Sequence, residues 1–307
     1  MSLLIEKPGL ESLIQGRPRS GLRHLGMPWA GPADPLSAAL ANRLVCNPAD
    51  TPLVEICFGG FQACFESAAS LALTGAIAVA TLDESPISFH QTVAVAPGST
   101  LRIGVPSLGL RSYLAIAGGV AVPHFLDSTS TYAPSRIGGY QGRKLQTGDR
   151  LRFGRCDGDR PLLTTPTALH PFLTRHWRLR CCHSAEAQWL TPASKRVLFE
   201  QLMTVGSRSN RMGMQWIGQP LCLDSKHEVM ASSPVFPGIV QCPPDGAPFV
   251  LGVDAQTTGG YPRVASVIRA DRHRLGQLRP GDTVGLIETE IDEAHTIYRE
   301  KRAAVAE

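Results

Sequence analysis

Short runs of apolar residues, bounded by glycine, proline and other turn residues, recur along the whole chain. They are rich in valine, isoleucine, leucine and phenylalanine, and several alternate apolar with polar positions, which is typical of β-strands. The runs are LVEIC, QACFE, AIAVATL, TLRIGV, SYLAIAG, RLRFG, RLRCC, VFPGIV, FVLGVD, RVASVIR and TVGLIE. Many short strands separated by turns indicate a mainly β protein built from barrels or sandwiches.

Two segments interrupt this pattern and predict short helices. The first follows Asp34, a residue type that caps helices, and continues with proline and with leucines spaced four residues apart. The second follows Thr191, again with proline at the first helical position, and places Leu202 on its inward face. Each helix is long enough to cover one face of a sheet or one mouth of a barrel.

A sequence repeat indicates how the strands are grouped. LQTGDRLRFG and LRPGDTVGLI share a leucine, a turn ending in Gly-Asp and an alternating strand, and APGSTLRIG is a looser third copy. Gly-Asp turns are common in β proteins, but two copies that each close a similar half of the chain favour two related β domains. We expect an N-terminal β domain over residues 1–155, a linker over 156–175, a C-terminal β domain over 176–289 and a helical or frayed tail over 290–307.

The composition excludes several classes of protein. Hydrophobic residues make up 43% of the chain and charged residues 18%, and no apolar run is long enough to span a bilayer. The N-terminal MSLLIEKPGL lacks the pattern of a secretory signal. The net charge of +4 is spread along the chain without a basic block. We therefore expect a cytoplasmic protein that binds neither nucleic acid nor membrane.

The eight cysteines predict free thiols. They form no Cys-x-x-Cys pair, and several lie within apolar, strand-like runs, so buried thiols explain them better than a disulfide framework or a zinc site. Cys181, Cys182 and His183 form the one cluster, but adjacent strand residues point to opposite faces. We expect no metal site.

The first stretch that could carry chemistry is RSGLRHLGMPWAGPAD, which contains Arg23, His24 and Asp34. Free N–H groups at a helix N-terminus suit a carboxylate or a phosphate. The alternative is that Asp34 only caps the helix and that His24 only packs. The spacing favours the cap for Asp34 and does not decide the role of His24.

A second polar stretch, GSRSNRMGMQ, places Arg208 and Arg211 on either side of Asn210. Guanidinium groups are preferred partners of carboxylate and phosphoryl oxygens. Taken alone, the stretch also fits a solvated basic loop.

The third stretch is DAQTTGGYPRVASVI, whose second half alternates as a strand. In its first half, Gly259 and Gly260 would let a ligand approach the backbone, while Gln256, Thr257 and Thr258 offer hydrogen bonds. The same residues also suit a tight turn between two strands, and the stretch alone does not distinguish the two.

Recognisable catalytic motifs are absent from the sequence. It contains no GxSxG elbow, no Walker A loop, no HExxH and no GxGxxG after a strand. A chain of this kind that takes part in ATP chemistry would do so without an ATP motif of its own. This indicates a subunit of a larger enzyme.

Taken in order, five segments resemble a known family. They are RHLGMPWAGPADPLSAALANRLVCNP, SYLAIAGGV, SNRMGMQWIGQPL, PPDGAPFVLGVDAQTTGGYPRVASVI and LRPGD. From about Pro8 to Glu288 the chain is similar to the biotin-dependent carboxyltransferase family, which includes the C subunit of 5-oxoprolinase, allophanate hydrolase subunit 2, KipA and a segment of urea carboxylase. The resemblance implies two cyclophilin-like β-barrel domains with a few short helices.

The resemblance is greatest to the 5-oxoprolinase members, which implies a hydrolase subunit that is inactive alone. Its expected partners are an A subunit and a B subunit similar to KipI or allophanate hydrolase subunit 1, and its ligand is a small carboxylated or amide substrate. ATP would act in the complex, because phosphorylating the oxygen of a stabilised lactam creates a leaving group before water attacks. The developing charge then requires arginines and backbone donors.

The resemblance and the polar stretches together give a candidate site. The catalytic candidates are His24 for proton transfer, Arg211 for a carboxylate or phosphate, and Asp34. The substrate-binding candidates are Arg23, Gln256, Thr257, Thr258, Gly259, Gly260 and Tyr261. Gly16 and Asn210 stand where family members carry aspartate, so the general base stays unassigned.

Two alternatives stay open. One is carboxyl transfer from carboxybiotin to urea or a related amide, for which the biotin would be on a separate carrier because no biotin-acceptor motif occurs in this chain. The other is a regulatory binding protein similar to KipA.

Overall fold

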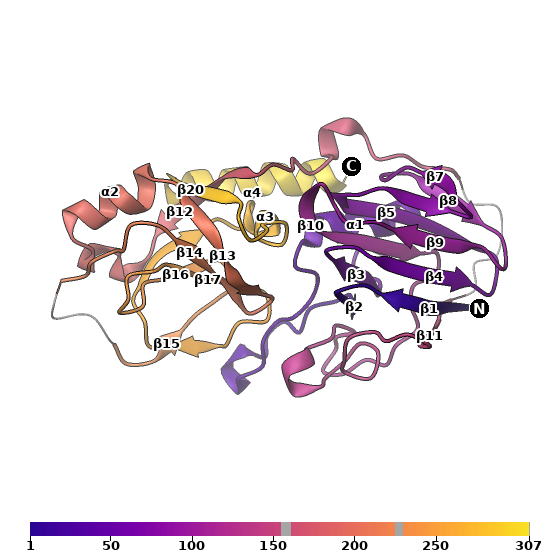
Figure 1. The fold of residues 1–307 in the computed structure, drawn as a ribbon. Helices are drawn as coiled ribbons and strands as arrows, with labels where there is room; N and C mark the ends of the chain where they lie inside the picture. Colours follow the sequence, from indigo (N-terminus) through magenta and orange to yellow (C-terminus); the bar gives the residue numbers. More distant parts are fainter. Residues whose placement is uncertain (155–160, 225–229, 307) are drawn as a thin grey trace. The chain divides into compact units, whose positions relative to one another are not determined.

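The structure is a computed structural model of the chain, and it describes residues 1–154, 161–224 and 230–306. The expectation of a mainly β protein is confirmed, since strands dominate the order of elements (Figure 1). The first residues of the predicted linker, 156–160, and Cys156 within it, lie outside the described residues.

The chain divides into two compact units. One contains Met1–Ser20 and Ala30–Leu173, and the other contains Gly21–Trp29 and Thr174–Glu307. The short segment Gly21–Trp29 therefore packs with the C-terminal unit although it lies early in the sequence. The sequence did not predict this placement, and the contacts that cause it are described with the candidate site.

The N-terminal unit contains two antiparallel sheets. One sheet has the strand order β11 (Arg150–Arg152), β1 (Ser2–Pro8), β4 (Phe61–Phe65), β9 (Thr100–Ile103), β6 (Ala80–Leu82) and β7 (Ser85–Ile87). The other has the order β2 (Glu11–Gln15), β3 (Leu53–Cys57), β10 (Leu108–Ile116), β5 (Ala69–Ile77) and β8 (Thr92–Val95). Apolar residues from both sheets form one continuous core, so the alternation seen in the sequence points each strand's apolar face inward.

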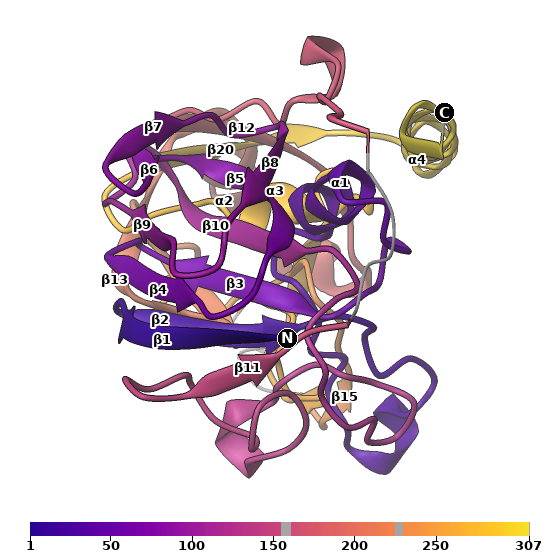
Figure 2. The same cartoon turned by 90° about the vertical axis from the view of Figure 1, so that its right-hand side faces the viewer.

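Helix α1 (Pro35–Leu44) packs against β5 and β10 of this unit, and Figure 2 shows it beside these strands. Its leucines at 40 and 44 are buried, and Leu44 lies in a second apolar cluster that includes Tyr113 and Ala115. The predicted cap is confirmed, because the Asp34 side chain accepts a hydrogen bond from the Ser37 amide. The unit also contains the 3-10 turns η2 (Ala133–Ser135) and η3 (Thr167–Leu169).

The C-terminal unit contains a closed seven-stranded barrel. Its order is β12 (His176–His183), β19 (Arg263–Val267), β16 (Ile239–Gln241), β17 (Phe249–Leu251), β14 (Gly213–Ile217), β13 (Met203–Asn210) and β20 (Thr283–Glu288). The closing pair, β12 and β20, is parallel, whereas the other neighbours are antiparallel. Trp177 and Trp216 are fully buried. A separate two-stranded ribbon joins β15 (Ser233–Pro234) to β18 (Thr258–Gly259).

The remaining helices belong to the C-terminal unit. They are η1 (Arg23–Leu25), η4 (Ala185–Trp189), α2 (Pro192–Glu200), α3 (Arg272–Leu275) and α4 (Ile291–Ala306). The cap of α2 by Thr191 is confirmed, but Leu202 is 50% exposed rather than inward-facing, because the helix ends at Glu200. None of the helices in the described part of the chain combines the length and apolar character needed to cross a membrane.

Seven cysteines lie within the described residues, and all are free thiols. Cys181 is buried and Cys182 only partly so, as expected for neighbours on the strand β12. Cys46 and Cys222 are exposed, so the expectation that the thiols are buried is wrong at these two positions. Both lie outside the named helices and strands.

The three copies of the sequence repeat form the same turn. In each copy a glycine adopts a left-handed φ, 87° at Gly98, 90° at Gly148 and 89° at Gly281. The next residue's amide donates to the carbonyl three positions back, at 3.2 Å for Ser99, 3.1 Å for Asp149 and 3.0 Å for Asp282. A β-strand follows each turn, so the repeat marks equivalent entries into strands.

We predict that Gly281→Ala lowers the free energy of unfolding by about 1–2 kcal/mol, since a Cβ disfavours the left-handed region. The φ of Gly281 is 89° and an added Cβ would meet no atom within 4 Å, so backbone strain is the only cost. Gly281→Asn should cost less, because asparagine tolerates this region better. Urea unfolding of both variants checks the order; equal stability of Gly281→Ala and the unsubstituted protein would contradict it.

Candidate functional site

Arg23 attaches the Gly21–Trp29 segment to the C-terminal unit. Its Nη2 donates to the carbonyl oxygens of Val235 at 2.6 Å and Gln256 at 2.7 Å. Its guanidinium carbon lies 5.5 Å from the ring centres of both Trp29 and Phe236, a cation–π geometry. Burial lowers the pKa of Arg23. The predicted substrate-binding arginine therefore binds two backbone carbonyls that flank the ribbon β15–β18.

The stretch QTTGGYPR contains the two-residue ribbon strand β18 and ends in Arg263, the first residue of β19. Thr258 and Gly259 pair with Pro234 and Ser233. Beside them, the Thr257 carbonyl accepts from the Val235 amide at 3.0 Å. The stretch is thus an ordered edge whose backbone is held on one side by residues 233–235.

The two glycines of the stretch are required by packing. Neither Gly259 nor Gly260 has a left-handed φ. A Cβ added at Gly259 would lie 2.7 Å from Nε2 of the buried Gln241, and one at Gly260 would lie 3.0 Å from the Met230 carbonyl oxygen. Neighbouring residues of the protein therefore lie close to both glycines, and the role of the glycines in substrate binding stays a prediction.

Four of the candidate residues have side chains accessible to a ligand. His24 in η1 is exposed, as are Gln256, Thr258 and Tyr261 along the ribbon. All four belong to the C-terminal unit. Thr257 is half-buried beside them. These exposed side chains are the part of the candidate site that can contact a substrate directly.

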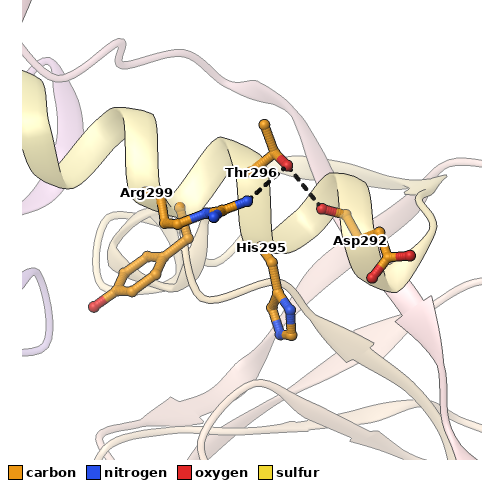
Figure 3. A pocket seen from close by; sticks show the side chains of 5 residues that line it. Asp292, His295, Thr296 and Arg299 are labelled. Atoms are coloured by element: carbon orange, nitrogen blue, oxygen red, sulfur yellow. Dashed lines mark hydrogen bonds between the residues drawn. The ribbon is translucent and has the colours of Figure 1, made fainter.

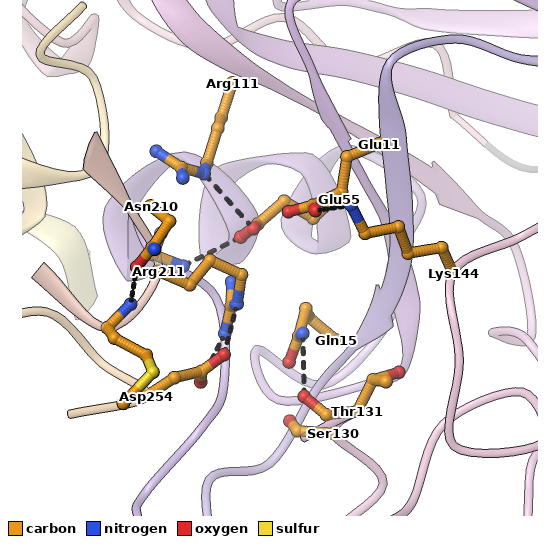
Figure 4. Close-up of polar contacts among 12 residues, drawn as sticks. Glu11, Gln15, Glu55, Arg111, Ser130, Thr131, Lys144, Asn210, Arg211 and Asp254 are labelled. Atoms are coloured by element: carbon orange, nitrogen blue, oxygen red, sulfur yellow. Dashed lines mark hydrogen bonds and ion pairs between the residues drawn. The ribbon is translucent and has the colours of Figure 1, made fainter. Parts of the chain in front are cut away.

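Arg211 is engaged in a buried ion pair (Figure 4). Its Nε donates to Oδ2 of Asp254 at 2.8 Å and its Nη2 to Oδ1 at 3.0 Å, a two-point fork. The side chains of both residues are at most 5% exposed. Asp254 was not among the sequence candidates, although its acidic side chain directly before AQTTGG was a usable signal. The role of Arg211 as a ligand of substrate stays a prediction, and its observed contact positions the start of the ribbon segment.

Asn210 replaces an expected aspartate without loss of the local structure. Its Oδ1 accepts a hydrogen bond from the Met212 amide at 2.8 Å, which an aspartate could accept equally well. The change therefore removes a charge while the turn is kept.

A second ion pair is made by the last residue of the stretch QTTGGYPR and was also missed from the sequence. Arg263 donates through Nε and Nη2 to the two oxygens of Glu186 at 2.7 and 2.6 Å. It also donates to the Pro234 carbonyl at 3.0 Å, which lies in β15. The hydrogen bond from Arg263 lowers the pKa of Glu186. Arg263 thus joins the ribbon to η4.

Asp34 lies in the N-terminal unit with both carboxylate oxygens occupied. Oδ1 accepts from the Ser37 amide at 3.0 Å and Oδ2 from the Ser37 hydroxyl at 2.6 Å, and the residue is fully buried. These contacts support the cap, and a catalytic role for Asp34 stays a prediction. Gly16, the other departure from the family pattern, has no room for a carboxylate, because a Cβ there would lie 2.4 Å from Oγ1 of Thr129.

The N-terminal unit also buries a charged cluster that the sequence analysis did not select. Glu55 accepts from the Ala33 amide at 2.8 Å and from the Tyr113 hydroxyl at 2.9 Å, and it lies 3.3 Å from Nε of Arg111 (Figure 4). Burial, with the nearby Glu55 charge, raises the pKa of Tyr113. Charged residues within the apolar runs LVEIC and LRSYLAI were the available signal. The cluster fixes the entry to α1.

The fold is that of a carboxyltransferase-type β protein, and comparison identifies its family. Residues 25–288 match the family described as "Carboxyltransferase domain, subdomain A and B", and the chain belongs to this family. It is 36% identical to the C subunit of 5-oxoprolinase from Escherichia coli, over 95% of this chain and 93% of that protein. It is 34% identical to the protein of the same name from Haemophilus influenzae, over 93% and 91%.

Larger proteins contain the same fold as one part. The chain is 31% identical to the urea amidolyase of Saccharomyces cerevisiae over 98% of its own length, but spans 17% of that protein. The solved structure of Kluyveromyces lactis urea amidolyase superposes with a TM-score of 0.93 at 27% identity, covering 99% of this chain and 20% of the amidolyase. The chain thus spans about one fifth of this solved relative.

We predict that Arg211 and Asp254 are energetically coupled. Removing either partner alone, by Arg211→Met or Asp254→Leu, should cost about 3 kcal/mol, because a buried charge loses its partner. The double variant should cost clearly less than the sum of the two, with a coupling above about 1 kcal/mol. Urea unfolding of all four proteins measures the cycle. Additive losses would show that the pair contributes no specific interaction.

Proposed function

We propose that this chain is the C subunit of an ATP-dependent 5-oxoprolinase, which opens 5-oxo-L-proline to L-glutamate together with A and B subunits. The observation that carries the proposal is the match to the Escherichia coli 5-oxoprolinase C subunit along nearly the whole of both proteins. The urea amidolyases match at somewhat lower identity, and there the chain corresponds to a small part of a longer protein. A separate subunit of this length fits the oxoprolinase arrangement better.

The chemistry assigned to the complex explains why a chain without an ATP motif would be required. A lactam carbonyl is stabilised by resonance, so transfer of the γ-phosphoryl group to its oxygen activates the carbon. Addition of water to that carbon and cleavage of the C–N bond then give an amine and an acyl phosphate. A second water releases inorganic phosphate and leaves the new carboxylate. The C subunit would supply donors to a charged, carboxylate-bearing substrate, while ATP binds elsewhere in the complex.

The geometry divides the candidate residues of this chain into two groups. The exposed His24, Gln256, Thr258 and Tyr261 side chains are the proposed substrate contacts, with His24 as the proposed proton carrier. Arg23, whose Nη2 binds two carbonyls, is a positioning residue for the ribbon. The protein is proposed to act in the cytoplasm and to be inactive without its partner subunits.

The assay is 5-oxoproline-dependent ATP hydrolysis by the complex reconstituted from this chain and purified A and B subunits. We predict that Gln256→Ala and Thr258→Ala each lower kcat/KM for 5-oxoproline at least tenfold, a loss of about 1.4 kcal/mol of transition-state stabilisation. The matched control is Gln219→Ala, an exposed glutamine of the same unit, which should change the rate less than twofold.

The results distinguish an error in the proposed activity from an error in the proposed substrate contacts. A complex that forms but shows no ATP hydrolysis in response to 5-oxoproline would contradict the proposed activity. Full activity in both ribbon variants would contradict the proposed contacts and leave the activity intact.

Carboxyl transfer is the second candidate, favoured by the superposition on Kluyveromyces lactis urea carboxylase, with a TM-score of 0.93 over 99% of this chain. It requires a biotinylated carrier and a biotin carboxylase as partners. Transfer of carboxyl from carboxybiotin to urea by this chain, without turnover of 5-oxoproline, would favour this function over the first.

A further inference from the structure

The helix α4 borders an open space in the C-terminal unit that the proposed function does not use. Its Ala294 and Tyr298 pack with Ile268 in a small apolar cluster. Farther along the helix, Lys301 Nζ donates to the Ala270 carbonyl at 2.9 Å. The helix lies beyond residue 288, where the family match ends. It therefore adds a wall to the barrel outside the family match.

Two adjoining cavities lie beside this helix. The inner cavity has a volume of about 290 Å³, and its walls include Arg269 and Arg272. The outer cavity has a volume of about 420 Å³ and includes Arg299. His295 and Tyr298 line both, and Figure 3 shows His295 projecting from α4. Two arginines and a histidine thus line an inner space large enough for a small molecule.

The arginines of the inner cavity have no carboxylate partner within the described part of the chain. The Arg269 guanidinium lies 4.5 Å from the ring centre of Tyr298. Arg272 makes one long hydrogen bond, from Nε to the Val267 carbonyl at 3.4 Å. Other arginines of this unit, such as Arg211 and Arg263, fork onto carboxylates. Exposed Arg269 and half-buried Arg272 therefore place two guanidinium groups without a carboxylate partner among the described residues on one wall of the inner cavity.

The nearest acidic residue in the sequence is committed elsewhere. Asp271 directly precedes Arg272, but its Oδ1 accepts from Nη2 of Arg180 at 2.7 Å and its Oδ2 from Nε of Arg180 at 2.9 Å. Arg274 lies 3.8 Å from the same carboxylate. The Asp271 carboxylate is thus paired with Arg180 and lies near Arg274. It therefore does not neutralise the two arginines of the inner cavity.

Burial lowers the pKa of Arg272, and the neighbouring charge of Arg269 lowers it further. An anion between the two groups would relieve both effects. Acidic side chains also border the space: Asp292 lines the outer cavity, and Glu290 and Glu293 act with burial to raise the pKa of Cys182, which lines the inner cavity. The charge that lowers the pKa of Arg272 is that of Arg269, so the arginine end of the inner cavity is the place where an anion is favoured.

We propose that the inner cavity binds a small oxyanion, a phosphate or a carboxylate, between Arg269 and Arg272. Guanidinium groups match the geometry of both oxyanions. The Ser266 side chain offers a further hydroxyl, while Val267 and Ala294 form an apolar wall that suits a ligand with a hydrocarbon body. The site is formed within the C-terminal unit and does not depend on the proposed oxoprolinase activity.

The test is calorimetric titration of the full chain with inorganic phosphate and, separately, with L-glutamate, against sodium chloride at equal ionic strength. We expect saturable binding of at least one oxyanion at one site per chain and none for chloride. Arg272→Gln and Arg269→Gln should each weaken binding at least tenfold. The matched control is Arg302→Gln, an exposed arginine of α4 that does not line either cavity, which should change affinity less than twofold.

Hydrogen exchange locates the ligand independently of affinity. The bound oxyanion should slow amide exchange in α4 and in residues 266–272 of the unsubstituted protein. Thermal melting shows whether each variant is folded, and the Arg269 variant keeps the test valid if Arg272→Gln fails to fold. Absence of saturable binding of both oxyanions would overturn the proposal, as would equal weakening by Arg302→Gln.

Discussion

One side chain, Arg23, determines how the candidate site is assembled. Its Nη2 donates to the carbonyl oxygens of Val235 and Gln256, which lie on the two sides of the ribbon. Hydrogen bonds from a charged donor are stronger than those between neutral groups, and this guanidinium also contacts two aromatic rings. Because Arg23 comes from the segment Gly21–Trp29, a piece of the early sequence becomes part of the C-terminal unit.

Two ion pairs extend this arrangement along the chain. Arg211 holds Asp254, which precedes the ribbon strand β18 by four residues, and Arg263, the first residue of β19, holds Glu186. The stretch QTTGGYPR is therefore anchored by the ion pair of Asp254 just before it and by that of Arg263 at its last residue, in addition to the contact of Arg23 at its first residue. The exposed side chains at positions 256, 258 and 261 are thus presented from a segment that is anchored near both ends.

Local patterns in the sequence predicted part of the fold. Apolar runs predicted strands such as β3, β10, β12 and β19, Asp34 and Thr191 predicted the two capped helices, and the Gly-Asp repeat marked equivalent turns. These features depend on neighbouring residues only. The strands β1, β2, β13 and β14 lie outside the predicted runs, and the polar stretch GSRSNRMGMQ, which also fitted a loop, contributes to β13 and β14. The inward position of Leu202 was wrong because a small difference in the end of α2 changes which face a residue occupies.

The contacts of the site could not be predicted in the same way. The ion pair of Arg211 with Asp254 and the hydrogen bonds of Arg23 to two carbonyls join positions far apart in the sequence. No rule of sequence spacing specifies such partners. The glycines at 259 and 260 show the same limit, since the sequence indicates a need for space but not which neighbours fill it. The unneutralised charge of Arg272 is visible only once the partners of Asp271 are known.

The central claim is that Arg23 holds the ribbon in place, and amide hydrogen exchange at Val235 tests it most directly. This amide donates to the Thr257 carbonyl across the ribbon, whereas the Val205 amide donates to Asp282 in the barrel. In Arg23→Gln, exchange at Val235 should accelerate at least tenfold, since the loss of a charged donor costs about 1.5–3 kcal/mol. Exchange at Val205 should not change. Unchanged exchange at Val235 would contradict the account, because the ribbon would then be ordered without Arg23.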